Sequence, residues 1–258
     1  MVTYKVKYKN YIADLYIPNI KSGKIVLLLP GLPKSSNVEK IINTFLSCGC
    51  FVIYPNFSGT FDSGGFFSGE QSVKDVKNFI KLAKLENVTE LYFGKKINLG
   101  LKNKIILSGM SFGSNIALLG CDDSVDKLIL LSPVLLFNKK DINKIISFDF
   151  HSQMRSLISL LKKAYPYTYR INQSRKVEDF IYGKNIFQSE SNIKNHLNNL
   201  KLPTLIIHGK IDNSVPWDIS YSLKKSINNN NISWEFPRVG HSLSSYDENT
   251  TNLITKFI

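Results

Sequence analysis

The chain has 258 residues, of which 43% are hydrophobic and 21% charged, and these fractions exclude intrinsic disorder, collagen-like repeats and coiled coils. The length suffices for one large α/β domain with a continuous core. No apolar run approaches the roughly 20 residues of a membrane-spanning helix, and the first residues lack the apolar core of a signal peptide. We therefore expect a soluble, cytoplasmic protein.

The formal net charge of +13 raises the question of an anionic partner, because basic groups release counterions when they neutralise phosphates. Only four basic residues are Arg, and the Lys residues are spread along the chain without a dense block or a nucleic-acid-binding motif. We expect no specific nucleic-acid partner. The charge favours solubility, and weak association with an anionic surface stays open.

The three cysteines cannot all pair, and Cys48 and Cys50 are too close in sequence for an easy bridge. This indicates free thiols in a reducing compartment, with Cys48, Cys50 and Cys121 acting as small apolar side chains. No spacing of Cys or His resembles a zinc site, and nothing in the sequence indicates a metal or an organic cofactor.

The strands are indicated by hydrophobic patterning. Two alternating runs, residues 4–8 and 12–17, predict an antiparallel hairpin at a sheet edge. Unbroken apolar runs follow, as expected of parallel strands that are covered on both faces. They comprise residues 24–29, 51–54, 104–108, 127–131 and 204–208, and a further strand is predicted at 232–236.

Helices are predicted between these strands from apolar residues at helical spacing. The first covers residues 38–46, with Ser36 and Glu39 as a capping box and Gly49 as a left-handed C-cap. The others cover residues 73–83, begin at Ser111, extend from 217 to 227 and include 253–257. The alternation of strands and helices predicts an open, doubly wound α/β sheet.

The section from residue 136 to 200 contains no convincing strand, and its simplest interpretation is a helical insertion within a single domain of residues 1–258. Apolar residues recur at helical spacing over 154–164, and the aromatic run 165–169 follows. Eleven Lys or Arg against five Asp or Glu make this section basic. We predict that it forms a cap or lid over a site.

A candidate nucleophile follows the predicted strand 104–108 in the sequence Gly109-Met-Ser111-Phe-Gly113, just before a helical stretch. This is the setting of a nucleophile elbow, where a tight turn strains the serine backbone. The glycines avoid collisions with the neighbouring strand and helix. Ser111 is therefore the candidate nucleophile.

A serine hydroxyl is a weak nucleophile unless an imidazole accepts its proton and a carboxylate orients that imidazole. Asp212 follows one predicted apolar strand, and His241 follows the next strand along the chain. Of the four histidines, His241 is the best candidate base, whereas His208 is expected to be satisfied by local hydrogen bonds. We predict a catalytic triad of Ser111, Asp212 and His241.

An acyl-transfer site also needs backbone N–H groups that bind the developing negative charge. Gly31 follows the strand 24–29 and would let the chain bend so that the Leu32 N–H faces the site, while Pro33 has no N–H to offer. The residue after the nucleophile, Phe112, would supply the second N–H. Leu32 and Phe112 are thus the predicted oxyanion hole.

The sequences G-M-S-F-G, H-G-K-I-D-N-S-V-P and V-G-H-S, in this order, resemble those of the α/β-hydrolase superfamily over nearly the whole chain. The resemblance implies a mostly parallel, doubly wound sheet with an N-terminal antiparallel hairpin and a helical lid at 136–200. Residues 54–65 are similar to the family's loop after its fourth strand, commonly written Arg-Gly-x-Gly-x-Ser. Here Ser58 replaces that Arg, and Phe61 replaces a usual Gly.

The preferred interpretation is a serine hydrolase that cleaves carboxylic esters of short-to-medium acyl chains through an acyl-enzyme on Ser111. One alternative is an aminopeptidase or acyl-peptide hydrolase for small peptides, in which Glu178 or Asp179 of the lid would hold the substrate amino group. Another is a catalytically inactive hydrolase-fold binding module. The sequence leaves the natural substrate and the oligomeric state open.

Overall fold

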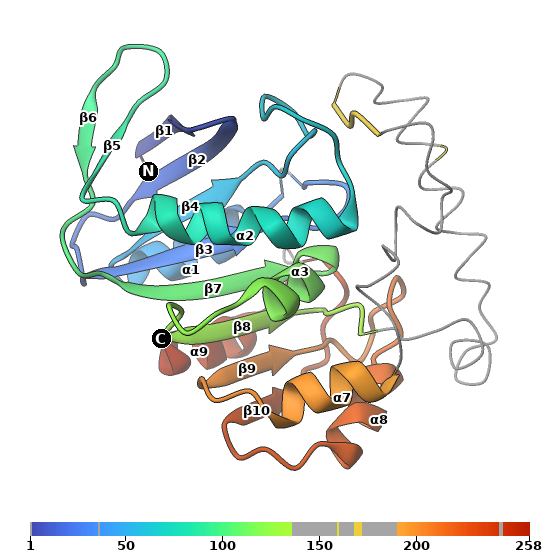
Figure 1. Ribbon diagram of the computed structural model, residues 1–258. Coiled ribbons are helices and arrows are strands. Elements are labelled where there is room, and N and C mark those ends of the chain that lie inside the picture. Colours follow the sequence, from blue (N-terminus) through green and yellow to red (C-terminus); the bar gives the residue numbers. More distant parts are fainter. Residues whose placement is uncertain (1, 36, 136–158, 160–167, 172–189, 243–244) are drawn as a thin grey trace.

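The computed structural model describes residues 2–35, 37–135, 159, 168–171, 190–242 and 245–258. In this part of the chain, an eight-stranded sheet has the order β1-β2-β4-β3-β7-β8-β9-β10, and β5 and β6 form a separate hairpin (Figure 1). The strands of the large sheet are β1 Val2–Tyr8, β2 Tyr11–Ile17, β3 Lys24–Leu29, β4 Cys50–Pro55, β7 Lys104–Met110, β8 Lys127–Leu131, β9 Thr204–Ile207 and β10 Ile232–Glu235.

The predicted strand arrangement is confirmed. β1 and β2 form an antiparallel hairpin at one edge of the sheet, and β2 is also antiparallel to β4. From β4 to β10 all neighbouring strands are parallel. At the centre, Leu27 of β3 pairs with Ile53 on one side and Leu107 on the other, and all three are fully buried. Parallel pairing brings the carboxyl ends of these strands to one edge of the sheet.

Helices cover both faces of the sheet, as predicted for a doubly wound fold (Figure 1). α1 Glu39–Ser47 and α9 Glu248–Phe257 pack on one face through Phe45 and Ile254. The apolar residues of the other four helices join the core on the opposite face. These helices are α2 Gly69–Ala83, α3 Phe112–Gly120, α7 Glu190–Asn198 and α8 Asp218–Ser226.

The predicted capping box at the start of α1 is wrong. The helix begins at Glu39, and its N-cap position is held by Val38, whose side chain has no oxygen to accept a hydrogen bond. Glu39 is therefore the first helical residue rather than the third, and Ser36 lies outside the described residues. The stop at the other end is confirmed, since Gly49 follows the helix with a φ of 72°.

The small hairpin of β5 and β6 and the predicted lid differ from the other elements in how far the sequence predicted them. β5 Asn87–Thr89 and β6 Lys96–Asn98 were not expected, because each carries a single buried side chain. Most of the predicted lid at 136–200 lies outside the described residues. Its main described parts are α7 and the segment 168–171. The lid and the single-domain boundary stay predictions.

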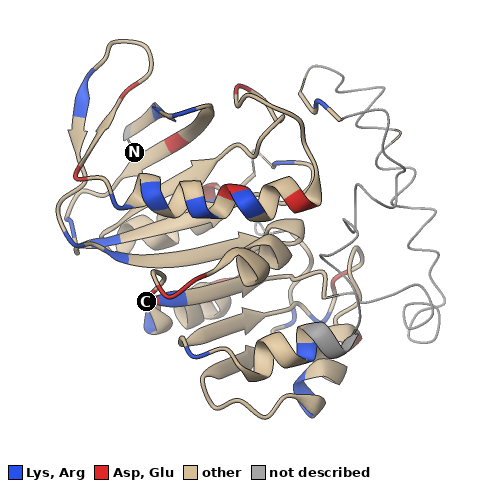
Figure 2. Ribbon diagram, in the orientation of Figure 1, with Lys and Arg blue, Asp and Glu red and all other residues tan. Residues whose placement is uncertain are grey.

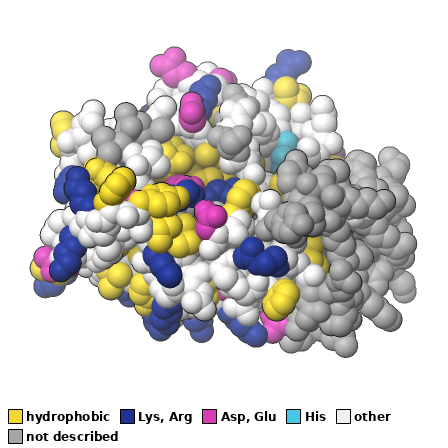
Figure 3. Space-filling model, turned by 90° about the horizontal axis from the view of Figure 1, so that it is seen from above, with side chains coloured by type: hydrophobic (Ala, Val, Ile, Leu, Met, Phe, Trp, Pro, Cys, Tyr) yellow, Lys and Arg dark blue, Asp and Glu magenta, His cyan; other side chains and the backbone are white. Residues whose placement is uncertain are grey.

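The cysteines are free thiols, and the charged residues are spread over the surface. Burial raises the pKa of the Cys50 and Cys121 thiols to about 11, which keeps both protonated near neutrality. Lys and Arg residues are distributed over most elements (Figure 2), and on the face seen from above they alternate with hydrophobic and acidic groups (Figure 3). No helix in the described segments has the length and apolarity that a bilayer crossing requires.

The first turn of α3 lies unusually close to the end of β3. A Cβ atom at Gly113 would lie 2.5 Å from the carbonyl oxygens of both Leu29 and Pro30. Because these acceptors belong to the backbone, a larger side chain could fit only if the helix moved away from the sheet. Glycine at position 113 therefore sets the distance between α3 and the sheet.

We expect Gly113→Ala to lower the free energy of unfolding by about 3 kcal/mol, because the added methyl group collides with the backbone of Leu29 and Pro30. Urea denaturation followed by circular dichroism measures this change. Gly64→Ala is a matched control, since its Cβ atom would come no closer than 3.3 Å to a neighbour, the Asn10 side chain, and should change stability far less. Equal losses for both variants would contradict the proposed contact.

Candidate active site

Ser111 lies between β7 and α3, so the predicted strand-turn-helix placement is confirmed. Its φ of 52° and ψ of −118° lie outside the regions that residues other than glycine normally occupy. Such a conformation costs on the order of 1–3 kcal/mol and persists only where the surroundings impose it. Here the Ser111 N–H donates to the carbonyl oxygen of Leu131 at 2.8 Å, which ties the turn to the end of β8.

Two close approaches hold this turn in place. A Cβ atom at Gly109 would collide with the carbonyl group of Gly113, so the strand and the helix can meet only without a side chain there. On the other side, a Cβ atom at Gly31 would lie 3.6 Å from the Cβ atom of Ser111. The loop after β3 is therefore in contact with the serine turn.

Asp212 and His241 are hydrogen-bonded to each other. His241 Nδ1 lies 2.7 Å from Asp212 Oδ2, although 29 residues separate them in the sequence. The Asp212 side chain is fully buried, whereas the His241 side chain is 22% exposed. With Nδ1 donating to the carboxylate, Nε2 is the nitrogen that can accept a proton. It has no hydrogen bond to a described residue.

The buried Asp212 carboxylate is surrounded by donors. Its Oδ1 accepts the N–H groups of Ser214 at 2.9 Å and Val215 at 2.8 Å. Burial alone would raise its pKa, but hydrogen bonds from His208, His241 and the Val215 backbone outweigh burial. The pKa of Asp212 is therefore well below its ordinary value, and this group is an anion throughout the neutral range.

His208 is a member of this cluster that sequence reasoning treated only as a locally bonded histidine. Its ring is completely buried, with Nδ1 at 2.7 Å from the Ser220 hydroxyl and Nε2 at 2.9 Å from the Val215 carbonyl oxygen. Because a carbonyl can only accept, Nε2 carries the proton, and it also lies 3.4 Å from Asp212 Oδ2. His208 thus holds the loop that carries Asp212 in place through its contacts with Val215 and Asp212.

The structure brings Asp212 and His241 together, but it has no hydrogen bond between the Ser111 hydroxyl and His241, both of which are described. Backbone contacts nevertheless connect the strand ends that carry them. Ser132, which follows β8, donates its N–H to Ile207 at 2.8 Å and its hydroxyl to the His241 carbonyl oxygen at 3.4 Å. Ser111 is in turn bonded to Leu131.

The predicted oxyanion residues lie next to residues of the serine turn: Phe112 directly follows Ser111, and Leu32 follows Gly31, which lies near Ser111. Phe112 is the first residue of α3, so its N–H has no acceptor within the helix. The Leu32 N–H makes no hydrogen bond to a described residue. Gly31 contacts the Ser111 turn and directly precedes Leu32, which brings this second N–H to the same region.

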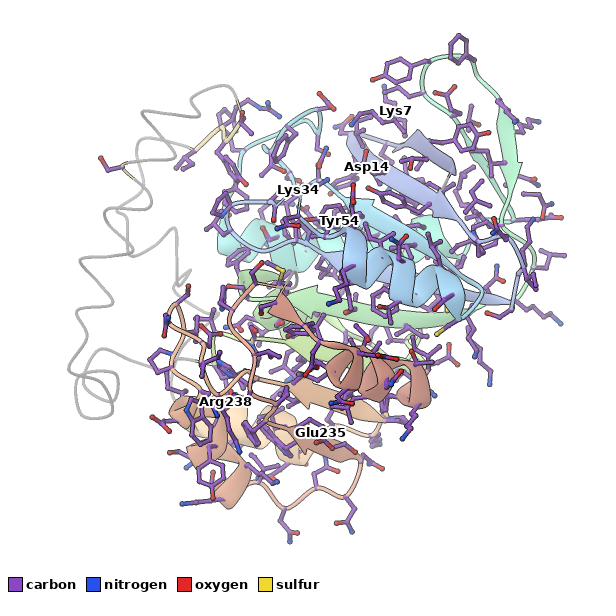
Figure 4. The ribbon with its side chains drawn as sticks, turned by 180° about the vertical axis from the view of Figure 1, so that it is seen from behind. Lys7, Asp14, Lys34, Tyr54, Glu235 and Arg238 are labelled. Atoms are coloured by element: carbon purple, nitrogen blue, oxygen red, sulfur yellow. The ribbon has the colours of Figure 1, made fainter. Side chains whose placement is uncertain are left out.

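Lys34, which the sequence reasoning did not single out, holds the far end of the Leu32 loop. Its Nζ atom lies 2.7 Å from Asn56 Oδ1, 3.1 Å from Asp14 Oδ2 and 4.1 Å from the ring centre of Tyr54 (Figure 4). Burial lowers the pKa of Lys34, and Asp14 opposes this effect. Its backbone N–H donates to the Tyr169 hydroxyl at 2.7 Å.

The loop after β4 also carries the two departures from the family pattern. Ser58 donates its N–H and hydroxyl to the buried carboxylate of Asp75, at 2.7 and 2.8 Å. Phe61, at a position where the family usually has Gly, keeps a positive φ of 46°. This loop pairs with segment 168–171, including a bridge between Thr60 and Tyr169. Glu178 and Asp179, the lid residues considered as partners for a substrate amino group, lie outside the described residues.

The described residues do not offer a metal site, since they contain no group of three or more His, Cys, Asp or Glu side chains arranged to hold an ion. The chemistry available to the cluster is proton transfer by an imidazole whose partner is a buried anion. That arrangement suits activation of a hydroxyl group.

The chain is similar in sequence and in fold to α/β-hydrolases. The chain is 26% identical to the AB hydrolase superfamily protein YisY of Bacillus subtilis, a match that covers 94% of each chain. The α/β-hydrolase GrgF from a Penicillium species has a TM-score of 0.67 at 16% identity, covering 99% of this chain and 96% of its own. The Pyrococcus furiosus esterase Pf2001 has a TM-score of 0.65 at 18% identity, with 99% and 89% covered.

No protein-family model matches the chain. The structural likeness, at these low identities, concerns the fold. The α/β-hydrolase fold predicted from the sequence is confirmed, as is the resemblance to that superfamily.

Asp212→Asn should reduce stability in a pH-dependent way. Because the folded-state pKa of Asp212 is depressed, its ionised form stabilises the fold above the unfolded-state pKa of about 3.9, and this contribution disappears as the pH falls through the folded value. We expect the wild type to exceed the variant by about 2 kcal/mol at neutral pH and by progressively less below about pH 4. Denaturation at several pH values measures the difference.

The exposed Asp123→Asn serves as the control and should leave this pH dependence unchanged. A difference between the wild type and Asp212→Asn that stays constant down to acid pH would show that the lost contact is not with the ionised carboxylate.

Proposed function

We propose that the protein is a serine hydrolase that cleaves carboxylic esters of short-to-medium acyl chains through an acyl-enzyme on Ser111. The observation that carries the proposal is the buried Asp212–His241 pair, which lies at the same edge of the sheet as the strained Ser111 turn. A base with a buried anionic partner and a serine in a costly conformation are both features of active sites rather than of packing.

In the proposed reaction, His241 Nε2 accepts the Ser111 hydroxyl proton while Oγ attacks the ester carbonyl carbon. The tetrahedral intermediate collapses, and the alcohol leaves with the proton that His241 returns. Water then attacks the acyl-enzyme with His241 again as the base, which releases the acid and restores Ser111. The Ser111 hydroxyl has no hydrogen bond to a described residue and is available to turn toward the imidazole.

Asp212 has a distinct role in this scheme. Its hydrogen bond with Nδ1 leaves Nε2 unprotonated and facing the reaction, and its negative charge stabilises the imidazolium that forms. The depressed pKa keeps that charge at neutral pH. The donors around the carboxylate fix its position, so the imidazole has one preferred orientation.

The Leu32 and Phe112 N–H groups are proposed to bind the oxyanion. Both lie beside the Ser111 turn, and the described residues leave both without an acceptor. Preorganised backbone donors of this kind favour the transition state because they need no rearrangement as charge develops. The packing of Gly113 on β3 holds α3, and with it the Phe112 N–H, at a fixed distance from the Leu32 loop.

An apolar acyl group is favoured by the partly exposed Phe112 ring next to the serine, which packs on buried aromatic rings. The Phe112 ring, half-buried, contacts Phe57 with ring centres 6.0 Å apart and Phe67 at 5.8 Å. Phe67 also contacts Tyr169 at 5.5 Å, within the aromatic run predicted to line the acyl pocket. The esterase among the structural relatives agrees with an ester substrate.

The central test is covalent labelling with a fluorophosphonate probe, followed by mass mapping of the modified residue. We expect modification at Ser111, and loss of both labelling and p-nitrophenyl ester hydrolysis in Ser111→Ala, because no other group would supply the nucleophile. Ser132→Ala is the matched control, since Ser132 also follows a strand with a positive φ, of 45°, and its variant should still be labelled.

A folded protein that never reacts with the probe would refute the hydrolase proposal in favour of a binding module. Cleavage of aminoacyl-naphthylamides but not of p-nitrophenyl esters would refute the ester assignment while leaving the nucleophile in place.

The oxyanion role of Leu32 is tested by Leu32→Pro, which removes the N–H, beside Leu32→Ala, which keeps it. We expect the proline variant to lose about 10²–10³-fold in kcat, the usual effect of removing one such donor. The alanine variant should retain most of its kcat. Circular dichroism and thermal melting confirm that both are folded, and similar kcat values for the two folded variants would contradict the assignment.

A further inference from the structure

Four aromatic rings and three lysines form a continuous surface where α8 meets β10. Trp217 and Tyr221 come from the start of α8, and Trp234 and Phe236 come from β10 and the residue after its end. We call this the aromatic–lysine surface; its basic members are Lys210, Lys224 and Lys225. It contains both tryptophans of the chain.

The rings of this surface contact one another. Phe236 lies at the centre, with its ring centre 5.7 Å from those of Trp217 and Tyr221 and 6.4 Å from that of Trp234. Tyr221 is 39% exposed, and the other three rings are half-buried. β10 is the last strand of the sheet and pairs only with β9 among the described strands, so nothing in the sheet covers this edge.

Each lysine lies over the face of one ring. The ammonium nitrogen of Lys225 is 4.6 Å from the ring centre of Tyr221, that of Lys224 is 5.6 Å from Phe236, and that of Lys210 is 5.9 Å from Trp217. The ammonium groups thus lie over the aromatic rings, while all three lysines are exposed to solvent. In Figure 2 the last turn of α8, which carries Lys224 and Lys225, is blue.

The surroundings add to the positive charge and to the apolar area. Arg238 is exposed three residues before His241, and Ile211, next to Asp212, is 51% exposed. Asp212, Asp218 and Glu235 are the acidic residues among positions 210–238, so basic groups outnumber acidic ones four to three. Glu235 and Arg238 lie on the β10 side of the molecule (Figure 4).

We propose that the aromatic–lysine surface docks the protein on anionic lipid bilayers. Trp and Tyr rings favour the boundary between headgroups and acyl chains, because each has an apolar body and a polar edge. Lysines beside them gain free energy from the negative potential of the same boundary. A surface that combines aromatic rings and lysines at an uncovered sheet edge therefore matches a bilayer, whose acyl chains are apolar and whose headgroups are anionic.

The ring arrangement favours a lipid surface over single-stranded nucleic acid. Stacking of bases requires open ring faces. Here a lysine lies over each of the Tyr221, Phe236 and Trp217 rings, and three of the neighbouring ring pairs meet at 52°, 60° and 85°. The fourth pair, Trp234 and Phe236, is stacked at 11°, so each of these rings already has one face opposite another ring. Headgroup phosphates, in contrast, can reach the ammonium groups without entering between the rings.

Docking at this surface would bring the Asp212–His241 pair close to the bilayer. Lys210 and Ile211 immediately precede Asp212, and Arg238 lies three residues before His241. The inference does not depend on the proposed reaction, since docking would occur with or without a nucleophile. A Ser111→Ala protein should therefore bind vesicles as the wild type does.

The test uses the full chain with vesicles of phosphatidylcholine alone or mixed about two to one with phosphatidylserine. We expect co-sedimentation only with the mixed vesicles, and less of it at high salt. Because both tryptophans belong to the surface, their fluorescence should shift to shorter wavelength on binding. Retention without a change in tryptophan emission would overturn the proposed location.

Charge reversal separates this surface from the net charge of the protein. Lys224→Glu with Lys225→Glu should weaken vesicle binding at least about tenfold. Lys77→Glu with Lys81→Glu, two exposed positions on α2, changes the net charge equally and should weaken it much less. Circular dichroism verifies that both double variants are folded.

Equal weakening by the two double variants would overturn the proposal in favour of unspecific attraction. A tryptophan shift with an oligothymidine but not with mixed vesicles would overturn it in favour of nucleic acid. Concentration-dependent self-association that buries the tryptophans, without vesicle binding, would overturn it in favour of pairing between β10 edges.

Discussion

The approach of α3 to the backbone of β3 is the contact on which the candidate site depends. Gly113 lies against the carbonyl groups of Leu29 and Pro30, and Gly109 lies against Gly113 itself. With both distances set by backbone atoms, the residue between them cannot relax, and Ser111 takes a positive φ. The same packing places the first N–H of α3 beside the loop that carries Leu32. In the proposed reaction, the position of the nucleophile and that of the oxyanion N–H groups would thus share one steric cause.

The second half of the site depends on electrostatics. A carboxylate without partners would be costly to bury, and Asp212 is buried because two backbone N–H groups and two imidazoles compensate its charge. His208 contributes a ring N–H, and the hydrogen bonds of its ring with Ser220 and Val215 fix the position of the ring. The His241 imidazole therefore faces an anion that remains charged and cannot turn away. Steric and electrostatic constraints meet at neighbouring strand ends, which Ser132 connects.

The buried strands could be predicted from the sequence because each carries its own signal, an unbroken apolar run such as that of β3. The strand ends then located Ser111, Asp212 and His241, since parallel strands share one carboxyl edge. Features that depend on tertiary partners were missed. In the sequence Lys34 is one lysine among many, and its contacts with Asp14, Asn56 and Tyr54 are visible only in the fold. Val38 stands at the N-cap position because packing, rather than capping, positions α1.

The aromatic–lysine surface shows the same limit for charge. A net charge of +13 does not indicate where an anionic partner would bind, because the lysines are spread along the whole chain. The location arises only when α8 and β10, distinct in the sequence, bring Tyr221 and Phe236 together under Lys224 and Lys225. A lysine held over an aromatic ring differs from one in free solution, because the ring anchors it where apolar and anionic groups can both be met. Local arrangement, rather than total charge, therefore decides where such a protein can bind a surface.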